Sequence, residues 1–291
     1  SMCVAGYARQ MFCEVPEHEI FRNQHGDMVL SGAMGVDKPK EVDGVILHHL
    51  RMISILTPIN CYMRKLDGDS GLLPQACFCI MMVLGEGEFA WVDGADLQSC
   101  FNLFYLPVSW RGYFTFSKTL CSSVFGGSSN KQSYVAIRAV PMGWINSVDV
   151  IQNFIRRFVF DVCGVPANLE VRKDRGFPDT SAGVVCMDGF DLITRLKIVR
   201  DHLVGAHTEL RFDEKGKSLE MSRFVTECRR RGLPLNEGKS VMQSFCASIL
   251  GGELDGVVGV LMHSREKGFR MFNRSLALLS LPEVPQVSCQ H

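Results

Sequence analysis

An α+β fold with a mostly antiparallel sheet is the class that this sequence predicts. Strand-like and helical stretches are mixed without the regular alternation of strand and helix that a parallel sheet requires. Residues 184–191, VVCMDGFD, place Asp-Gly between apolar residues, which is typical of a two-residue β-hairpin. Two other segments repeat apolar residues at helical spacing. With 291 residues, the chain has room for one large domain or two medium ones.

The first strands are predicted between residues 89 and 106. Residues 89–97, FAWVDGADL, predict a strand that bends at Gly94, and residues 100–106 predict an apolar and aromatic continuation of it. Two short strands at 184–187 and 191–193 flank the Asp-Gly turn. Stretches rich in Gly, Pro, Asp, Ser or Lys are expected to be surface loops: residues 35–43, 67–71, 126–133 and 171–181.

Two amphipathic helices are predicted, one on each side of the hairpin. Asn146 or Ser147 can cap the first helix, and Gly232 stands where a glycine ends the second. Both helices show apolar residues at i, i+3, i+4 and i+7. These residues are Ile151, Phe154, Ile155 and Phe158 in the first helix and Met221, Phe224, Val225 and Cys228 in the second.

Composition indicates an ordinary globular protein, with 46% hydrophobic and 21% charged residues. Lys+Arg and Asp+Glu both number 31, so any nucleic-acid surface must come from local clusters of basic residues. The 12 cysteines form no C-x-x-C pair and no zinc-like set, and we read them as reduced and mostly buried. The apolar run at residues 76–84 is too short to span a membrane, and no signal peptide precedes it, so we expect an intracellular protein of the cytoplasm or nucleus.

Four segments, in one order, resemble the motifs of reverse transcriptases of the retroelement type. In the first, residues 50–60, LRMISILTPIN, an Arg is followed nine residues later by an Asn. The Arg of that family contacts the incoming triphosphate, which implies this role for Arg51, with Lys38 or Lys40 upstream as helpers. A guanidinium fork suits phosphate oxygens. The alternative is a surface Arg beside an apolar strand.

The second segment, DLQSCFNLFYLP at residues 96–107, is similar to the first catalytic motif of the family. The resemblance implies that Asp96 and the backbone carbonyl of Leu97 hold the catalytic metals. It also implies that Phe101 blocks a ribose 2′-hydroxyl and so selects deoxynucleotides, with a plain core role as the alternative. Asp93 does not fit the motif, and we read it as an acid at a strand end or turn.

The third segment, VPMGWINS at residues 140–147, continues to Gln152 and resembles L-P-x-G-x-x-N-S-P-x-x-F-Q. The resemblance places Met142 and Gly143 beside the nucleotide and the templating base. A glycine allows this close approach because it has no Cβ. Met142 stands where retroviral members carry Gln, and Val148 stands where many members carry Pro.

The fourth segment, CMDG at residues 186–189, aligns with the Y-x-D-D box, which sits on a β-hairpin in this family. Asp188 would be the principal metal ligand of the box. Residues 231–239, RGLPLNEGK, look like G-L-x-L-N-x-x-K and imply nucleotide binding by Lys239. Residues 249–251, ILG, look like the start of the primer grip. Local basicity indicates nucleic-acid contacts at Arg229, Arg230 and Arg231, because residues 221–240 hold five basic and two acidic side chains, with a solvated helix face as the alternative. The primer-grip resemblance adds Leu250 and Gly251.

The resemblance implies the fingers and palm of a right-hand polymerase, an antiparallel palm sheet packed on helices, and a missing or truncated thumb. The expected boundaries are 1–90 for the first part of the fingers, 91–117 for the palm with the first catalytic motif, 118–140 for a fingers insertion, 141–262 for the rest of the palm, and 263–291 for the start of a thumb or tail.

The implied function is RNA-directed DNA polymerisation by a domain of a retrotransposon-like element. Carboxylates would hold two Mg²⁺ or Mn²⁺ ions about 3.5–4 Å apart for nucleotidyl transfer to a primer 3′-hydroxyl. The implied partners are an RNA template, a DNA primer and deoxynucleotide triphosphates, with RNase H and integrase domains in the same polyprotein and no membrane.

Two departures affect the fourth segment. Cys186 replaces the usual aromatic residue, and Gly189 replaces the second Asp of the box, so one carboxylate is lost and metal binding should weaken. Asp191 would substitute only if the hairpin is shifted, because alternation places residues 188 and 191 on opposite faces of a regular strand. A decayed copy that keeps only the polymerase fold and nucleic-acid binding is therefore the alternative function, and an unrelated α+β domain is the third.

Overall fold

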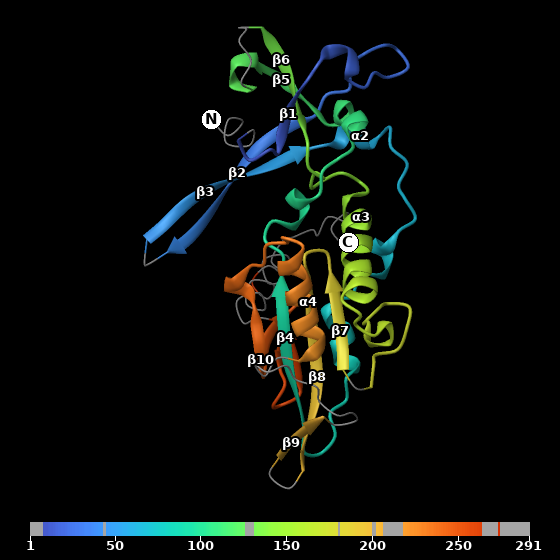
Figure 1. The fold of residues 1–291 in the computed structure, drawn as a ribbon, viewed down its shortest axis with the longest axis vertical. Coiled ribbons are helices and arrows are strands. Elements are labelled where there is room, and N and C mark those ends of the chain that lie inside the picture. The colour runs from blue at the N-terminus through green and yellow to red at the C-terminus, as the bar shows by residue number, and fades with distance from the viewer. Residues whose placement is uncertain are drawn as a thin grey trace, which may run out of the picture. The chain divides into compact units, whose positions relative to one another are not determined.

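The computed structural model describes residues 8–42, 45–125, 131–179, 181–199, 202–205, 218–263 and 273 (Figure 1). The chain divides into two compact units. Unit 1 comprises residues 1–70 and 97–155, and unit 2 comprises residues 71–96 and 156–291. Mixed helices and antiparallel sheets agree with the predicted α+β class. Apart from residues 263 and 273, the predicted thumb segment 263–291 lies outside the described residues.

Unit 1 contains a three-stranded antiparallel sheet and a long two-stranded hairpin. The base of the hairpin joins the sheet through Ser31, whose N–H donates to the Thr115 carbonyl at 2.8 Å and whose carbonyl accepts the Ser117 N–H at 2.9 Å. The sheet has the order β1-β6-β5, with β1 Phe12–Val15, β6 Gln132–Ile137 and β5 Thr115–Cys121. The hairpin strands are β2 Gly32–Val42 and β3 Val45–Ile55, and the helices are α2 Thr57–Asn60 and α3 Ser147–Arg157, of which residues to Ile155 belong to this unit.

Unit 2 is built on an antiparallel sheet with the strand order β10-β4-β8-β7, and β9 pairs with the far end of β8. A second antiparallel sheet has the order β11-β12-β13. The strands of the first sheet are β10 Val241–Ser244, β4 Glu88–Asp96, β8 Gly189–Val199, β7 Ser181–Cys186 and β9 His202–Gly205. Those of the second are β11 Cys246–Ile249, β12 Gly252–Asp255 and β13 Val260–His263, and the helix is α4 Leu219–Arg230.

Short 3₁₀ and π turns connect these elements. In unit 1 they are η1 Glu17–Glu19, η2 Asp69–Leu72, which ends in unit 2, η4 Cys100–Leu103, η5 Val108–Phe114 and η6 Ser122–Phe125. In unit 2 they are η3 Ala76–Met81, the π turn η7 Phe158–Val162, η8 Ala167–Leu169 and η9 Glu237–Lys239.

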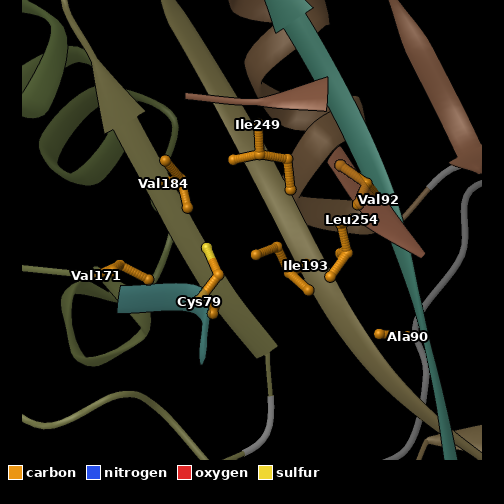
Figure 2. Packing of buried hydrophobic residues seen from close by; sticks show 9 residues of the cluster. Cys79, Ala90, Val92, Val171, Val184, Ile193, Ile249 and Leu254 are labelled. Carbon is orange, nitrogen blue, oxygen red and sulfur yellow. The ribbon is translucent and has the colours of Figure 1, made fainter. Parts of the chain in front are cut away.

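Each face of the main sheet in unit 2 has its own apolar layer, because side chains alternate along a strand. On one face, Val92 and Ile193 pack with Ile249 and Leu254 of the second sheet (Figure 2). On the other face, the ring of Phe190 lies 5.5 Å from the ring of Phe224 in α4. Burying apolar side chains on both faces keeps β4 and β8 in a fixed register.

Several predicted elements are confirmed. The strand predicted at 89–97 is β4, and the first helix starts at Ser147 and becomes a π turn at Phe158. The second helix is α4, and Gly232 follows its end with φ 69°, the left-handed conformation expected of a terminating glycine. The hairpin strands are β7 and β8, both longer than predicted.

Two predictions of local structure are wrong. Residues 35–43 were expected to form a loop, but β2 continues through Pro39 to Val42. Both strands of this ribbon are edge strands, where a proline without an N–H is tolerated. Residues 100–106 were expected to form a strand, but they begin with the 3₁₀ turn η4. Ser99 has a left-handed backbone, with φ 54°, and this conformation breaks the extended path after Asp96.

Candidate active site

Two aspartates that are distant in sequence meet at one end of the main sheet of unit 2. Asp96 is the last residue of β4, and it lies directly opposite Gly189, the first residue of β8. Asp188 precedes Gly189 in the turn between β7 and β8. Asp96 and Asp188 are close enough for the charge of Asp96 to raise the pKa of Asp188, in addition to the larger effect of burial. The structure therefore brings together the two residues that the sequence predicted as metal ligands.

The hairpin is confirmed, but its turn is shifted by one residue from the expected Asp-Gly. Cys186 pairs with Gly189, so Met187 and Asp188 are the two central residues of the turn. Met187 is the turn residue with a positive φ, at 33°, and the φ of Gly189 is not positive. A Cβ at position 189 would come within 3.0 Å of a carboxylate oxygen of Asp96, which lies at the end of a flexible side chain. Gly189 thus follows the turn as the first residue of β8 and packs close to Asp96.

Asp191 also belongs to this end of the sheet. It pairs with Gly94 of β4, and a Cβ on Gly94 would come closer than 3.0 Å to an Asp191 carboxylate oxygen. The expectation that residues 188 and 191 face opposite sides assumed that both lie in a regular strand. Asp188 lies in the turn, where strand alternation does not apply. We call Asp96, Asp188 and Asp191 the acid site.

Lys239 supplies a positive charge to the acid site. Its Nζ lies 2.8 Å from Oδ2 of Asp96. The backbone fixes this approach, because the Asn236 N–H donates to the Asp96 carbonyl at 2.8 Å and the Lys239 N–H donates to the Asn236 carbonyl at 3.0 Å. The hydrogen bond and the charge of Asp96 raise the pKa of Lys239, which therefore stays protonated. The segment 231–239, predicted to bind nucleotide, is thus attached to the end of β4.

The acid site is electrostatically crowded. Burial, followed by the charges of Asp96 and Asp188, raises the pKa of Asp191 to about 7. Burial, followed by the charge of Asp188, raises the pKa of the Cys186 thiol to about 11. Both shifts disfavour the charged form, as expected for acids held together with partial exclusion of water. One ammonium group faces three carboxyl groups here.

The acid site fits a hard divalent cation in its donor chemistry. Mg²⁺ and Mn²⁺ prefer carboxylate oxygens, and the two glycines leave room for the Asp96 and Asp191 side chains. Within the described ranges, no three His, Cys, Asp or Glu side chains stand close enough to share one ion. The positively charged group that pairs with the Asp96 carboxylate in this arrangement is the Lys239 ammonium group.

Asp93 has a different environment from Asp96, although both lie in β4. The interpretation of Asp93 as an acid at a strand end or turn is wrong, because it lies within the strand and its exposed fraction is 0%. It points to the face opposite Asp96, because the two positions differ by three, an odd number, along the strand. Its Oδ1 accepts the N–H of Gln243 in β10 at 3.0 Å. Asp93 therefore joins two strands of the sheet.

The predicted nucleotide-binding residues other than Lys239 lie in unit 1. Arg51 is exposed on β3, opposite Val36, and Lys40 lies in β2. Phe101 lies in η4 and is partly buried. Gly143 has φ 97°, and Met142 beside it is 45% exposed. Leu97 is the first residue of unit 1 after β4 and is buried.

Sequence reasoning missed a set of polar side chains that holds the Gly143 segment within unit 1. The Asn60 amide donates to the Gly143 carbonyl at 2.9 Å and accepts the Ile145 N–H at 3.0 Å. Asn146 accepts the Leu66 N–H at 2.8 Å and donates to the Arg64 carbonyl at 3.1 Å. Asp149 accepts the Ser70 N–H at 2.8 Å. We call Asn60, Asn146 and Asp149 the polar junction.

Part of the polar junction had a signal in the sequence. Asn60 is the residue that follows Arg51 by nine positions in the first segment, and Asn146 belongs to the third segment. The pattern marked both residues, but their bonding partners lie about eighty residues away in the chain and could not be read from spacing.

The predicted nucleic-acid contacts of unit 2 lie at the C-terminal end of α4 and at the turn between β11 and β12. Arg230 and Arg231 pair with Glu227 at 2.8 Å and 3.2 Å, and Arg229 approaches Glu237 at 3.5 Å. All three guanidinium groups remain largely exposed, so these ion pairs are weak. Leu250 and Gly251, with φ 50° and 81°, form the tight turn between β11 and β12.

None of the helices in the part of the chain that the structure describes is long and apolar enough to cross a membrane.

The fold is similar to that of a reverse transcriptase. Two solved structures match the chain with 12% sequence identity each: the foamy viral protease-reverse transcriptase dRH in complex with ds DNA, with a TM-score of 0.54, and the foamy viral protease-reverse transcriptase in complex with RNA/DNA hybrid, with a TM-score of 0.51. The matches cover 92% and 90% of this chain but only 35% and 26% of those chains. No protein-family model and no curated protein matches the sequence.

Proposed function

We propose that the chain is an RNA-directed DNA polymerase domain of the retroelement type. The observation that carries this proposal is the pairing of Asp96 with Gly189, which brings Asp96 and Asp188 to the same end of one sheet. Two carboxylates at one point are what metal-assisted nucleotidyl transfer requires. The likeness in fold to the foamy viral enzymes supports the same function, and those enzymes were solved with ds DNA and RNA/DNA hybrid.

Asp96 and Asp188 would hold the metal ions, with the Leu97 carbonyl as a further ligand. The bound ions would activate a primer 3′-hydroxyl and stabilise the displacement of pyrophosphate. The residues of this chain would supply positioning and charge. Lys239 stays protonated beside Asp96, so it can neutralise phosphate oxygens once it leaves that carboxylate. Arg51, Lys40, Phe101, Met142 and Gly143 keep the nucleotide-binding roles that the resemblance implies, as proposals.

The division into fingers at 1–90 and 118–140 and palm at 91–117 and 141–262 is part of the proposal. Template and primer would contact Arg229, Arg230, Arg231, Leu250 and Gly251. The three arginines are exposed and their partners are surface carboxylates, so phosphate groups can replace those partners at little cost. Membership of a longer polyprotein with RNase H and integrase domains is likewise proposed.

Primer extension tests the function. The unchanged chain should extend a DNA primer on an RNA template with Mg²⁺, or with Mn²⁺ in its place. Asp96→Asn should lower the rate by roughly 10²-fold or more, because it removes the charge of one metal-binding carboxylate. Asp93→Asn is the matched control, since it makes the same change in the same strand on the opposite face. Equal extension by the unchanged chain and by Asp96→Asn would contradict the proposal.

A decayed polymerase that binds nucleic acid without extending it is the second candidate. The observation that favours it is the glycine at position 189, where the resemblance calls for a second Asp. In this case the unchanged chain would shift a labelled RNA/DNA hybrid in a gel but would give no extension with either metal. The shift should weaken steeply as salt is raised, because phosphate contacts release counterions.

A further inference from the structure

Strands β1 and β6 of unit 1 pair with each other (Figure 1), and a cavity of about 470 Å³ opens beside them. A volume of this size is in the range of small-molecule sites. The rings of Phe12 and Phe125 supply buried apolar surface to the cavity, and the rest of its lining is small or polar. Its lining residues are Ala8, Gln10, Phe12, Cys13, Glu14, Phe125 and Arg138. All of them belong to unit 1, so the cavity is no part of the acid site of unit 2.

The guanidinium group of Arg138 lines this cavity with few hydrogen bonds of its own. Its Nη1 lies 3.5 Å from the side-chain oxygen of Gln10, which is a long hydrogen bond. Its central carbon lies 4.7 Å from the centre of the Tyr105 ring, an arrangement that attracts a cation to the ring face. Its Nε is buried and has no hydrogen-bond partner among the described residues. A buried N–H without a partner is costly, so this group favours a ligand that accepts its hydrogen bonds.

A second guanidinium group approaches the same wall of the cavity. Arg111 is partly buried, and its Nε is also buried without a hydrogen-bond partner in the described part of the chain. Burial raises the pKa of the Cys13 thiol, whereas the charges of Arg111 and Arg138 and a hydrogen bond with Arg111 act in the opposite direction. Both guanidinium groups are therefore close to Cys13. Neither of them forms an ion pair with a carboxylate of the described residues.

The carboxylates near this wall do not cancel the two positive charges. Glu14 lines the cavity, but its Oε1 already accepts hydrogen bonds from the Ser122 hydroxyl at 2.9 Å and from the Ser133 hydroxyl. Glu19 has the weakest effect of the charges that act on Cys13, and its side chain is 50% exposed, so water screens it. The surroundings of Cys13 therefore favour an anion.

We propose that this cavity binds a small organic phosphate. Guanidinium N–H groups match phosphate oxygens, and a phosphate group with about two negative charges suits two guanidinium groups better than a carboxylate does. The rings of Phe12 and Phe125 would contact the apolar part of the ligand, and Glu14 would accept a hydrogen bond from one of its amino or hydroxyl groups. The site lies in unit 1 and does not rest on the proposed function. A phosphate of a nucleic-acid backbone offers the same chemistry from another source.

Calorimetric titration of the full chain with inorganic phosphate and with adenosine monophosphate tests the proposal. At least one of these probes should bind saturably in the millimolar range or more tightly. Arg138→Gln should weaken this binding by about tenfold or more, because it removes a charged donor from the cavity wall. Arg64→Gln is the matched control at an exposed arginine of unit 1, and its affinity should stay within about twofold of the unchanged chain. Equal affinity of Arg138→Gln and the unchanged chain would overturn the proposal, and so would the absence of saturable binding of both probes.

Alkylation of the cysteines gives a second reading that needs no variant. A phosphate bound in the cavity should slow the reaction of Cys13 with N-ethylmaleimide several-fold, followed by mass spectrometry, because the ligand covers the thiol. Cys61, an exposed cysteine of unit 1, is the internal control and should react at the same rate with and without ligand. A single-stranded oligonucleotide separates the two sources of phosphate. If the oligonucleotide protected Cys13 while inorganic phosphate and adenosine monophosphate did not, the small-molecule proposal would be wrong.

Discussion

The acid site of unit 2 and the polar junction of unit 1 both gather polar side chains, but by opposite principles. In the polar junction, Asn60 and Asn146 each use the oxygen and the nitrogen of one amide, and every partner is a backbone group of complementary kind. In the acid site, like charges stand together, and Lys239 compensates only Asp96 directly. In the first region the Asn60 and Asn146 amides have complementary partners, although Oδ2 of the buried Asp149 has none. In the second region the carboxylates repel one another.

This difference indicates that the polar junction stabilises the fold, whereas the acid site lowers its stability in a way that cation binding would relieve. Buried and satisfied hydrogen bonds stabilise a structure, and losing one partner is costly because the other stays buried. Crowded carboxylates destabilise a fold until a cation joins them, and this trade of stability for function is common at active sites. Substitutions in the two regions should therefore change stability in opposite directions.

The largest expected effect is a loss of stability in the polar junction. Asn146→Ala removes two hydrogen bonds and leaves the Leu66 N–H and the Arg64 carbonyl without these partners. Asn146 is only 4% exposed, so water does not easily replace it. We expect the free energy of unfolding, measured by urea titration, to fall by about 3 kcal/mol.

Asn153→Ala is the control for this prediction. Asn153 is also in α3, but it is exposed, and its side-chain amide donates to the Asp69 carboxylate at 3.0 Å. Its loss should change the free energy of unfolding by no more than about 0.5 kcal/mol. If the two variants were equally stable, the polar junction would not be the stabilising region that we infer.

The second effect is a gain in stability in the acid site. The folded pKa of Asp191 is raised to about 7 from an ordinary 3.8. Between these values the folded chain binds more protons than the unfolded chain, so the free energy of unfolding falls as pH rises through that window. Asp191→Asn removes the ionisable group, so the variant should not lose free energy of unfolding in this pH window. In EDTA at pH 8 the variant should be more stable than the unchanged chain by on the order of 1 kcal/mol or more, and below pH 4 the two should be similar.

Denaturation at several pH values measures this effect, and Asp179→Asn, a change at an exposed acid, serves as the control with an expected change under about 0.5 kcal/mol. A variant Asp191→Asn that is less stable than the unchanged chain at pH 8, with an unaltered pH slope, would show that Asp191 stabilises the fold and is not under repulsion.

The smallest effect concerns Lys239. Its side chain is 61% exposed and that of Asp96 is 27% exposed, so their ion pair contributes at most about 1 kcal/mol. Lys239→Met should lower the free energy of unfolding by less than this in low salt and by nothing measurable at about 1 M salt, where charges are screened. Lys239→Arg should retain most of the interaction. A loss above about 2 kcal/mol that persists in high salt would mean that Lys239 has a structural role.

The sequence by itself determined the elements whose signals are local. The helices at 147–157 and 219–230 follow from apolar spacing and from Gly232, and the strand at 88–96 and the hairpin of β7 and β8 follow from apolar runs and a turn. These signals act over a few residues, because a helix repeats every 3.6 residues and a turn involves four. The order of the motifs also pointed to a reverse transcriptase, and the fold is similar to one.

Only the tertiary structure decided the register of the hairpin turn, the side of the sheet that Asp191 faces, and the partners of Asn60 and Asn146. Met187 and Asp188 form the centre of the turn because Gly189 pairs with Cys186 of β7 and with Asp96 of β4. The amides of Asn60 and Asn146 found backbone groups about eighty residues away. Such contacts depend on how strands and loops pack against each other in space, and no pattern of nearby residues encodes that packing.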